Sequence, residues 1–310
     1  MQDHQQAQVG PSRQSSGGLL GQTRLILRTM RPKQWTKNVF VWTALLFDVK
    51  LFEQEPFLRT LVAFVLFCLV SSTVYIINDI IDVEKDRQHP TKRSRPLASG
   101  QLSKPVAAIA AALLALLTTP AAWWLGSAFS LILYGYLALM ILYSLLLKNI
   151  VIIDVLTLAA GFVLRVGAGV IAVQADRFSP WIYVCMTLLA LFLAVGKRRQ
   201  EIVLLANNSD TTRAILCEYN LRFLDEMLAL VSSSTVMAYS LYTFSAPNLP
   251  DNHTMMLSIP CVLYGLFRYL YLIHVKGETD PPDVVALKDR PLQVAVAAFA
   301  LVVFLVMYLS

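Results

Sequence analysis

Charged side chains are scarce in this chain of 310 residues. They make up 15% of it, whereas ordinary soluble domains carry roughly 25%. Apolar side chains make up 56%, and the mean hydropathy is +0.59. The apolar residues come in runs of about 18 to 25, the length that a helix needs to cross a hydrocarbon layer about 30 Å thick. This composition argues against a water-soluble globule and predicts a polytopic membrane protein.

Cysteine and histidine are also few, with four of each. No two cysteines stand at a short spacing, which argues against a disulfide framework or a zinc site. The histidines show no metal-ligand spacing either. Residues 1–23 are polar, rich in Gly, Ser and Gln, and contain no apolar signal-peptide core. They predict a disordered cytosolic tail, followed by a single transmembrane catalytic domain over 24–310.

Nine apolar segments predict an all-α bundle of nine transmembrane helices, because lipid-exposed strands with free edges cannot satisfy their backbone groups. The first segment is short and is interrupted by Asp48. Two polar stretches, 81–103 and 205–222, are predicted as cytosolic loops. The segments are 38–52, 57–80, 104–124, 127–147, 150–173, 180–204, 223–246, 255–273 and 291–309.

The basic residues lie on alternate sides of these segments. Of the 26 Lys and Arg, 21 precede the first segment or follow segments two, four, six and eight, and only Lys50, Arg59 and Arg177 fall on the other side. By the positive-inside rule the N-terminus is cytosolic and the C-terminus, after nine crossings, is outside the plasma (inner) membrane. The net charge of +6 then reflects topology and phosphate chemistry, and a nucleic-acid partner is not expected.

Three carboxylates directly follow the second segment, in the stretch NDIIDVEKDRQHPTKRSRPLASG that begins at Asn78. Asp79, Asp82 and Asp86 are spaced i, i+3, i+7, so on one helix they fall within roughly 60° of one another. Asn78 lies at the edge of this stripe. Hard oxygen ligands on one helical face suit Mg²⁺, which usually binds through one or two carboxylates plus substrate phosphates.

A basic cluster, Lys92, Arg93 and Arg95, follows these carboxylates closely. Acidic residues followed in the sequence by basic residues suit the binding of a diphosphate that is bridged by a metal ion. The metal would lie on one side of the leaving group and the cationic side chains on the other. The alternative is a solvated acidic helix end, paired with Lys85 and Arg87 by i+3 and i+4 contacts. Carboxylates that extend an apolar segment beside lipid are costly unless they are neutralised, which favours the metal site.

Two further groups of charged residues lie at the same predicted membrane face. The string GKRRQE (196–201) ends segment six and offers Lys197, Arg198 and Glu201, although a stop-transfer cluster would look the same. Lys148 and Asp154 begin segment five. Asp154 lies about 9 Å deeper at a rise of 1.5 Å per residue, where facing lipid is disfavoured.

For other residues in or near these segments, the sequence predicts a less specific role. Arg165 is about three turns beyond Asp154 and faces the same way, into the bundle. Lys33 and Lys37, one turn apart, are candidates for phosphate or lipid-headgroup contacts. Glycines at 161, 167 and 169 are expected to let helices approach closely, because no strand precedes them as in a phosphate-binding loop.

The motifs described above resemble those of a known family. The string NDIIDVEKD resembles the first aspartate-rich motif, N-D-x-x-D-x-x-x-D, of the UbiA superfamily of intramembrane prenyltransferases. Typical members carry a second motif, D-x-x-x-D, where this chain has GKRRQE. That replacement is similar to the decaprenyl-phosphate phosphoribosyltransferase branch, which the chain also resembles at RPKQWTKN (31–38), HPTKRSRP (89–96) and GFVLR (161–165). The resemblance covers essentially everything after residue 28.

The resemblance implies a UbiA-type helical bundle with a central cavity open to the cytosol. It implies Mg²⁺-dependent transfer of the 5-phosphoribosyl group of phosphoribosyl diphosphate to a polyprenyl (decaprenyl-type) phosphate, with release of diphosphate. Asp79, Asp82 and Asp86 would be catalytic and would bind the metal, with Asn78 in support. The implied substrate-binding residues are Lys33, Lys37, Asn78, Lys92, Arg93, Arg95, Lys148, Asp154, Lys197, Arg198 and Glu201.

Two other functions stay open on the sequence. A conventional prenyltransferase, which moves a prenyl group from its diphosphate to an aromatic acceptor, explains the first motif but leaves GKRRQE unexplained. A non-enzymatic transporter would use the charged helix ends as a translocation site. However, these charges gather at one membrane face, whereas transporter sites usually lie near the midplane. The expected partners are the two substrates and membrane lipids, and a homo-oligomer is compatible with the sequence.

Overall fold

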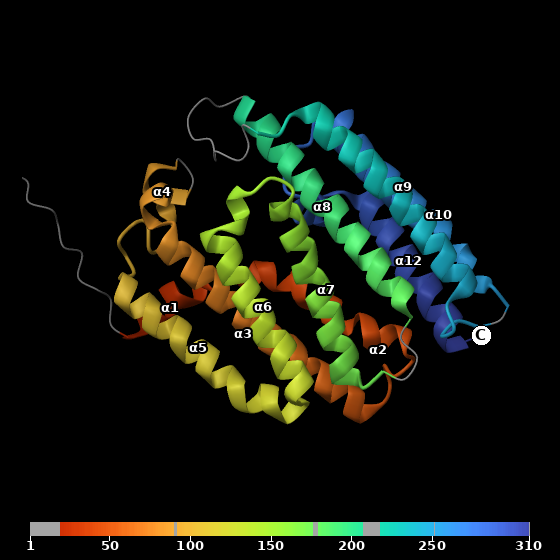
Figure 1. Cartoon of the computed structure of the whole chain (residues 1–310), viewed down its shortest axis with the longest axis horizontal. Coiled ribbons are helices and arrows are strands. Elements are labelled where there is room, and N and C mark those ends of the chain that lie inside the picture. The colour runs from red at the N-terminus through yellow and green to blue at the C-terminus, as the bar shows by residue number, and fades with distance from the viewer. Residues whose placement is uncertain (1–18, 90–91, 176–178, 207–217, 251, 310) are drawn as a thin grey trace, which may run out of the picture.

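The computed structural model describes residues 19–89, 92–175, 179–206, 218–250 and 252–309, and all regular structure in these ranges is helical (Figure 1). The α-helices, with the 3₁₀ helices written η, are α1 (Leu19–Thr29), η1 (Pro32–Trp42), α2 (Thr43–Phe47), α3 (Gln54–Ile81), α4 (Val83–Gln88), η2 (Lys92–Ser94), α5 (Lys104–Leu125), α6 (Ser127–Leu145), η3 (Leu147–Asn149), α7 (Ile153–Val173), α8 (Pro180–Ala206), α9 (Leu221–Ser245), η5 (Thr254–Ser258), α10 (Ile259–His274), α11 (Pro282–Lys288) and α12 (Arg290–Leu309).

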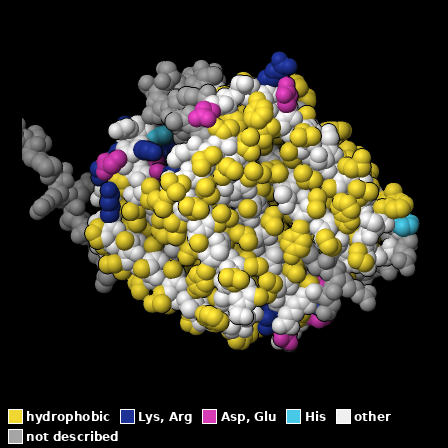
Figure 2. All heavy atoms as spheres, in the orientation of Figure 1, with side chains coloured by type: hydrophobic (Ala, Val, Ile, Leu, Met, Phe, Trp, Pro, Cys, Tyr) yellow, Lys and Arg dark blue, Asp and Glu magenta, His cyan; other side chains and the backbone are white. Residues whose placement is uncertain are grey.

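Eight helices in the described ranges are long and apolar enough to cross a membrane. They are α3, α5, α6, α7, α8, α9, the continuous η5–α10 unit and α12, and they correspond to the second to ninth predicted segments. The all-α prediction is therefore confirmed. Figure 2 shows apolar side chains spread over the visible face, with charged side chains at its margins. Exposed leucines on separate helices, such as Leu116, Leu131 and Leu230, contribute to this lipid-compatible surface.

The first predicted segment, 38–52, is not one continuous α-helix. It consists of the end of η1 and the short α2, and the chain leaves helical geometry at Asp48 and Val49, where φ of Val49 is +58°. A 3₁₀ helix rises about 2.0 Å per residue, so η1 covers more length than an α-helix of equal residue number. A pattern based on α-helical spans therefore finds the segment but not its conformation.

This broken segment still runs between the two ends of the bundle. Arg31, just before η1, contacts Asp79 near the end of α3. At the other end of the segment, the carbonyl of Phe47 accepts a hydrogen bond of 3.1 Å from Asn248, which follows α9. The described ranges therefore contain eight membrane-length helices and this broken segment, which agrees approximately with the predicted nine.

Close backbone approach holds η1 against α7. A Cβ added to Gly169 would lie 2.1 Å from the carbonyl oxygen of Val41, so only glycine fits there. Gly167 is different, because the nearest atom to an added Cβ is 3.7 Å away. Of these two glycines predicted to allow close packing, Gly169 is the one that packing requires.

Two predicted boundaries differ in the structure. Helix α1 begins at Leu19, inside the segment 1–23 predicted to be disordered, and residues 1–18 lie outside the described ranges. The predicted loop 81–103 contains α4 and η2. Most of the other predicted loop, 205–222, also falls outside the described ranges, at 207–217.

Candidate active site

Asp79 and Asp86 converge on a single cationic nitrogen. Both carboxylates are buried, Asp79 near the end of α3 and Asp86 on α4. Nη1 of Arg95 lies 3.2 Å from Oδ1 of Asp79 and 2.6 Å from Oδ2 of Asp86. Arg31 also donates to Oδ1 of Asp79. Two carboxylates and two guanidinium groups therefore neutralise one another, as buried charges must.

Asp82 occupies a break between helices. Helix α3 ends at Ile81 and α4 begins at Val83, so the continuous helix expected over 78–86 is interrupted. The backbone stays close to helical, because Asp82 N–H donates to the carbonyl of Asn78 at 2.9 Å. The Asp82 side chain turns to another element: Nζ of Lys148, on η3, donates to its two oxygens at 2.9 and 3.0 Å.

The carboxylates of Asp79 and Asp86 suit a divalent cation. In the described part of the chain, no group of three or more His, Cys, Asp or Glu side chains is already assembled as a metal site. However, Mg²⁺ usually takes only one or two carboxylates and completes its shell with water and substrate phosphate. Asp79 and Asp86 already face one cationic position. They would hold the metal, with Asp82 and Asn78 adjoining them in sequence.

Arg198 lies at the centre of a second buried network. It is 1% exposed, and its Nε donates to Oδ2 of Asp154 at 2.6 Å. Its Nη1 and Nη2 donate to Glu201 at 2.5 Å and to the hydroxyl of Tyr143 at 2.9 Å. The sequence predicts Arg198 as a phosphate ligand, but in the structure all three of its guanidinium nitrogens, Nε, Nη1 and Nη2, donate to protein groups. The network therefore fixes the end of α8, and Lys197 next to it is half-buried.

Tyr219 belongs to the same network and is absent from the predicted set. Its hydroxyl donates to Oδ1 of Asp154 at 2.7 Å and accepts from the N–H of Ile152, also at 2.7 Å. Burial raises the pKa of Tyr219 to about 12, and the hydrogen bond to Asp154 acts in the same direction. The hydroxyl therefore keeps its proton at neutral pH and stays a donor. In the sequence, Tyr219 stands among polar residues before a helix start, and an ordinary helix start explains it as well as a place in the site does.

The remaining basic candidates are more peripheral. Lys33 is exposed and Lys37 is half-buried. Both lie on η1, where positions four apart are about 120° apart because a 3₁₀ helix has three residues per turn. The two lysines are therefore not stacked one turn apart as α-helical spacing predicts, and their role as phosphate or headgroup ligands stays a prediction. Arg93 is exposed and Lys92 is half-buried, both on η2 beside the aspartates.

Arg165 points into the bundle, as the sequence predicts, but not toward Asp154. Its Nε donates to Oδ1 of Asn38 at 2.8 Å, and its Nη2 donates to the hydroxyl of Tyr136 at 2.7 Å. Asn38 is buried on η1. Arg165 therefore ties α7 to η1 and α6 as a structural group.

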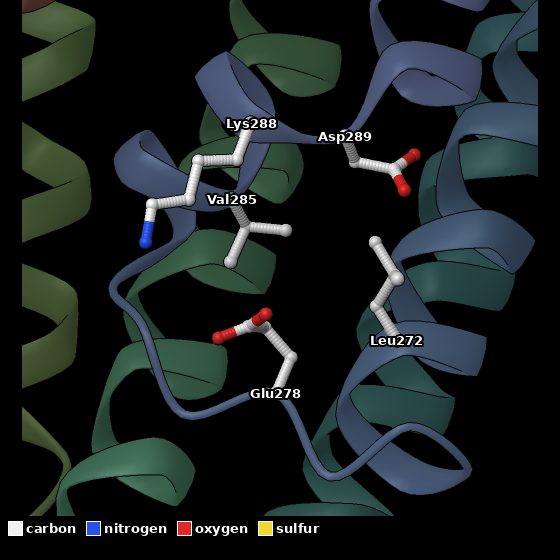
Figure 3. Close-up of a pocket in the computed structure, with 5 residues that line it drawn as sticks. All are labelled: Leu272, Glu278, Val285, Lys288 and Asp289. Atoms are coloured by element: carbon white, nitrogen blue, oxygen red, sulfur yellow. The ribbon is translucent and has the colours of Figure 1, made fainter.

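Two cavities lie away from the aspartates. One of about 150 Å³ lies between α10, α11 and α12 and is lined by Leu272, Glu278, Val285, Lys288 and Asp289 (Figure 3). Two of its three charged residues, Lys288 and Asp289, are paired with Asp280 and Arg268. The other, of about 410 Å³, is apolar and is lined by α6, α7 and α8. The central cavity open to the cytosol thus stays a prediction.

The fold and the ion-pair networks define a class of protein. The chain is an all-helical membrane protein with buried carboxylates and cations at one end of the bundle, an arrangement suited to a metal-bound phosphate. Residues 39–287 match the UbiA prenyltransferase family. The chain belongs to this family, which confirms the resemblance seen in its first aspartate-rich motif.

Three curated relatives carry the same name, decaprenyl-phosphate phosphoribosyltransferase. The relative from Mycolicibacterium smegmatis is 31% identical, and the match covers 96% of this chain and 95% of the relative. The relative from Corynebacterium glutamicum is 33% identical over 92% of this chain and 87% of its own length. The one from Mycobacterium tuberculosis is 31% identical over 88% and 91%.

Solved structures share the fold. A UbiA homolog from Archaeoglobus fulgidus bound to GPP and Mg²⁺ aligns with a TM-score of 0.69 at 19% identity, over 91% of this chain and 99% of that one. A digeranylgeranylglyceryl phosphate synthase aligns with a TM-score of 0.67 at 17% identity, over 92% and 98%. At these identities the likeness concerns the fold alone.

Proposed function

We propose that the chain transfers the 5-phosphoribosyl group of phosphoribosyl diphosphate to a polyprenyl phosphate and releases diphosphate, with Mg²⁺ bound, at the cytosolic face of the plasma membrane. The names of the three relatives, each matched over most of both chains, support this proposal. The observation that carries it is the basic string GKRRQE on α8, which stands in place of a second carboxylate motif and presents Lys197 beside the buried Arg198–Asp154 pair. A donor with a 5-phosphate besides its diphosphate needs a cation such as Lys197 there.

The first aspartate-rich motif would hold a metal ion at the leaving-group end of the site. Asp79 and Asp86 would hold Mg²⁺, and Asp82 and Asn78 would complete this end of the site. When bound, the ion would neutralise the negative charge that grows on the departing diphosphate. Arg95, which contacts both Asp79 and Asp86, exchanges these carboxylates for phosphate oxygens of the donor.

The other basic residues bind phosphate at the mouth of the bundle. Lys197 binds the donor, with Arg198 and Asp154 holding the end of α8 and Glu201 in place. Lys148 neutralises Asp82 at 2.9 Å and is assigned to a phosphate at this end of the site. The more exposed Lys33, Lys37, Lys92 and Arg93 are assigned to the acceptor headgroup or to the outer donor phosphate.

The acceptor phosphate is anionic at neutral pH, so the reaction needs no strong general base. An acceptor oxygen forms a bond to C1 of the ribose while the bond from C1 to the diphosphate oxygen breaks. Attack from the side opposite the diphosphate inverts the configuration at C1. Catalysis then rests on positioning and charge stabilisation.

A transfer assay with purified protein in detergent tests this function. Phosphoribosyl diphosphate labelled in the ribose is supplied with polyprenyl phosphate, with Mg²⁺ or with EDTA. We expect label in the extracted lipid with Mg²⁺ and none with EDTA. Label that stays in water, together with product formed from a prenyl diphosphate and an aromatic acceptor, would favour the conventional prenyltransferase. Absence of any product in both reactions would favour the transporter.

The orientation of the chain is part of the same proposal. The basic loops and the nine predicted crossings support a cytosolic N-terminus and an external C-terminus. The aspartates then face the side of the membrane where a water-soluble sugar diphosphate is made.

A further inference from the structure

One short turn joins the two networks of the site. It runs from the end of α6 to the start of α7 and carries Lys148, and Asp154 follows it in the first turn of α7. Lys148 bonds Asp82 of the first motif, at 2.9 Å. Asp154 bonds Arg198 of the basic motif on α8, at 2.6 Å. The turn therefore links the metal end and the basic end of the site.

The turn contains a strained residue. Ile152 has φ of +69° and ψ of −45°, a positive-φ γ-turn conformation that is rare and strained. A β-branched side chain makes positive φ especially unfavourable. Such conformations persist only where surrounding contacts hold them, and they gather at functional sites. The Ile152 side chain is 42% exposed, so core packing does not explain its backbone.

Tyr219 supplies the contact that holds the turn. Its hydroxyl accepts the N–H of Ile152 at 2.7 Å and donates to Asp154 at 2.7 Å. The ring is buried and stacks on Phe223, with centroids 6.2 Å apart. One oxygen atom therefore satisfies the strained amide and orients the carboxylate that holds Arg198.

We propose that Tyr219 is a positioning residue of this enzyme. Its hydroxyl holds Ile152 in the strained conformation, so that Lys148 and Asp154 reach Asp82 and Arg198 at the same time. Phenylalanine at 219 preserves the buried ring but leaves the Ile152 N–H without its acceptor. The turn then relaxes toward negative φ and moves Lys148 away from the site. The kinetic part of this inference rests on the proposed function, whereas the structural part does not.

The test compares Tyr219→Phe, Ile152→Gly and the double variant, with Tyr264→Phe, an exposed tyrosine on α10, as the control. We expect Tyr219→Phe to lower kcat by up to about 100-fold, the loss that a misplacement of roughly 1 Å can cause. Ile152→Gly alone should stay near wild type, since glycine adopts positive φ readily. The double variant should recover at least about tenfold of the lost kcat, because the turn no longer needs the hydroxyl to overcome strain.

Hydrogen–deuterium exchange over residues 146–156 gives a readout independent of substrate. Exchange should rise in Tyr219→Phe and not in Tyr264→Phe. A purely structural role predicts a double variant as inactive as Tyr219→Phe or worse, and that result would overturn the inference. Wild-type kcat and exchange in Tyr219→Phe would overturn it too. Raised exchange in Tyr219→Phe, with no phosphoribosyl transfer by the wild type, would reject the proposed function and keep the structural part.

Discussion

Replacing Asp86 by asparagine is expected to lower kcat/KM by about 100-fold or more, the scale seen when one charge-stabilising group is removed from an active site. Asparagine keeps the size of the side chain but loses the charge that Asp86 offers to Arg95 at 2.6 Å and, in the proposed complex, to the metal. Steady-state kinetics at several Mg²⁺ concentrations measure the effect. The Mg²⁺ concentration for half-maximal rate should also rise.

Glu84→Gln is the matched control for this variant. Glu84 lies on the same helix, α4, but its side chain is 69% exposed and pairs with Arg87. Its removal should leave kcat/KM nearly unchanged. Full activity in Asp86→Asn, in protein that elutes normally from a sizing column, would reject the metal assignment.

Replacing Arg198 by alanine is expected to destabilise the protein by about 3–5 kcal/mol, the loss typical of removing one partner of a buried ion pair. Asp154 is 0% exposed and would keep a buried charge without its guanidinium partner. Thermal unfolding in detergent measures this loss. Removing both charges, with Arg198→Met and Asp154→Leu together, should destabilise less than Arg198→Ala alone, because the fully buried carboxylate is removed with its partner and Glu201, which also pairs with Arg198, is 26% exposed.

Arg222→Ala provides the comparison. Its side chain is 90% exposed and pairs with Glu226, so its loss should change stability by about 0–1 kcal/mol. A stable Arg198→Ala protein with weakened donor binding would contradict the supporting role. It would favour direct phosphate contact, as the sequence alone predicts for this arginine.

Hydropathy predicts the eight long helices well because each of them must cover the hydrocarbon layer with apolar side chains. The first segment is predicted less completely. Its 3₁₀ geometry depends on contacts that are distant in sequence, such as Gly169 against Val41 and Arg165 with Asn38. No local pattern around residue 38 contains those partners.

The charged motifs are found in the sequence, but their pairing is not. Their spacing predicts that Asp79, Asp82 and Asp86 lie together on one helical face. In the structure, Asp82 is separate from the other two and forms an ion pair with Lys148. That pairing joins residues 66 positions apart in the sequence, which a spacing along one helix cannot express. The aspartates and the basic residues stay predictions as substrate and metal ligands.

Burial is the other quantity that spacing misses. The adjacent residues Lys197 and Arg198 look equivalent in GKRRQE, but a rotation of about 100° along the helix turns Arg198 into the core, where it is 1% exposed. The partners that it meets there, Tyr143 and Asp154, come from α6 and α7. Tyr219 joins them only through the tertiary fold.

The most direct test of the central claim is a structure of the protein with phosphoribosyl diphosphate and Mg²⁺ bound. We predict density for a metal ion in contact with Asp79 and Asp86, with the donor diphosphate on it and the Arg95 guanidinium moved from these carboxylates to a phosphate oxygen. Density for the donor elsewhere, with Arg95 still bridging Asp79 and Asp86, would contradict the account.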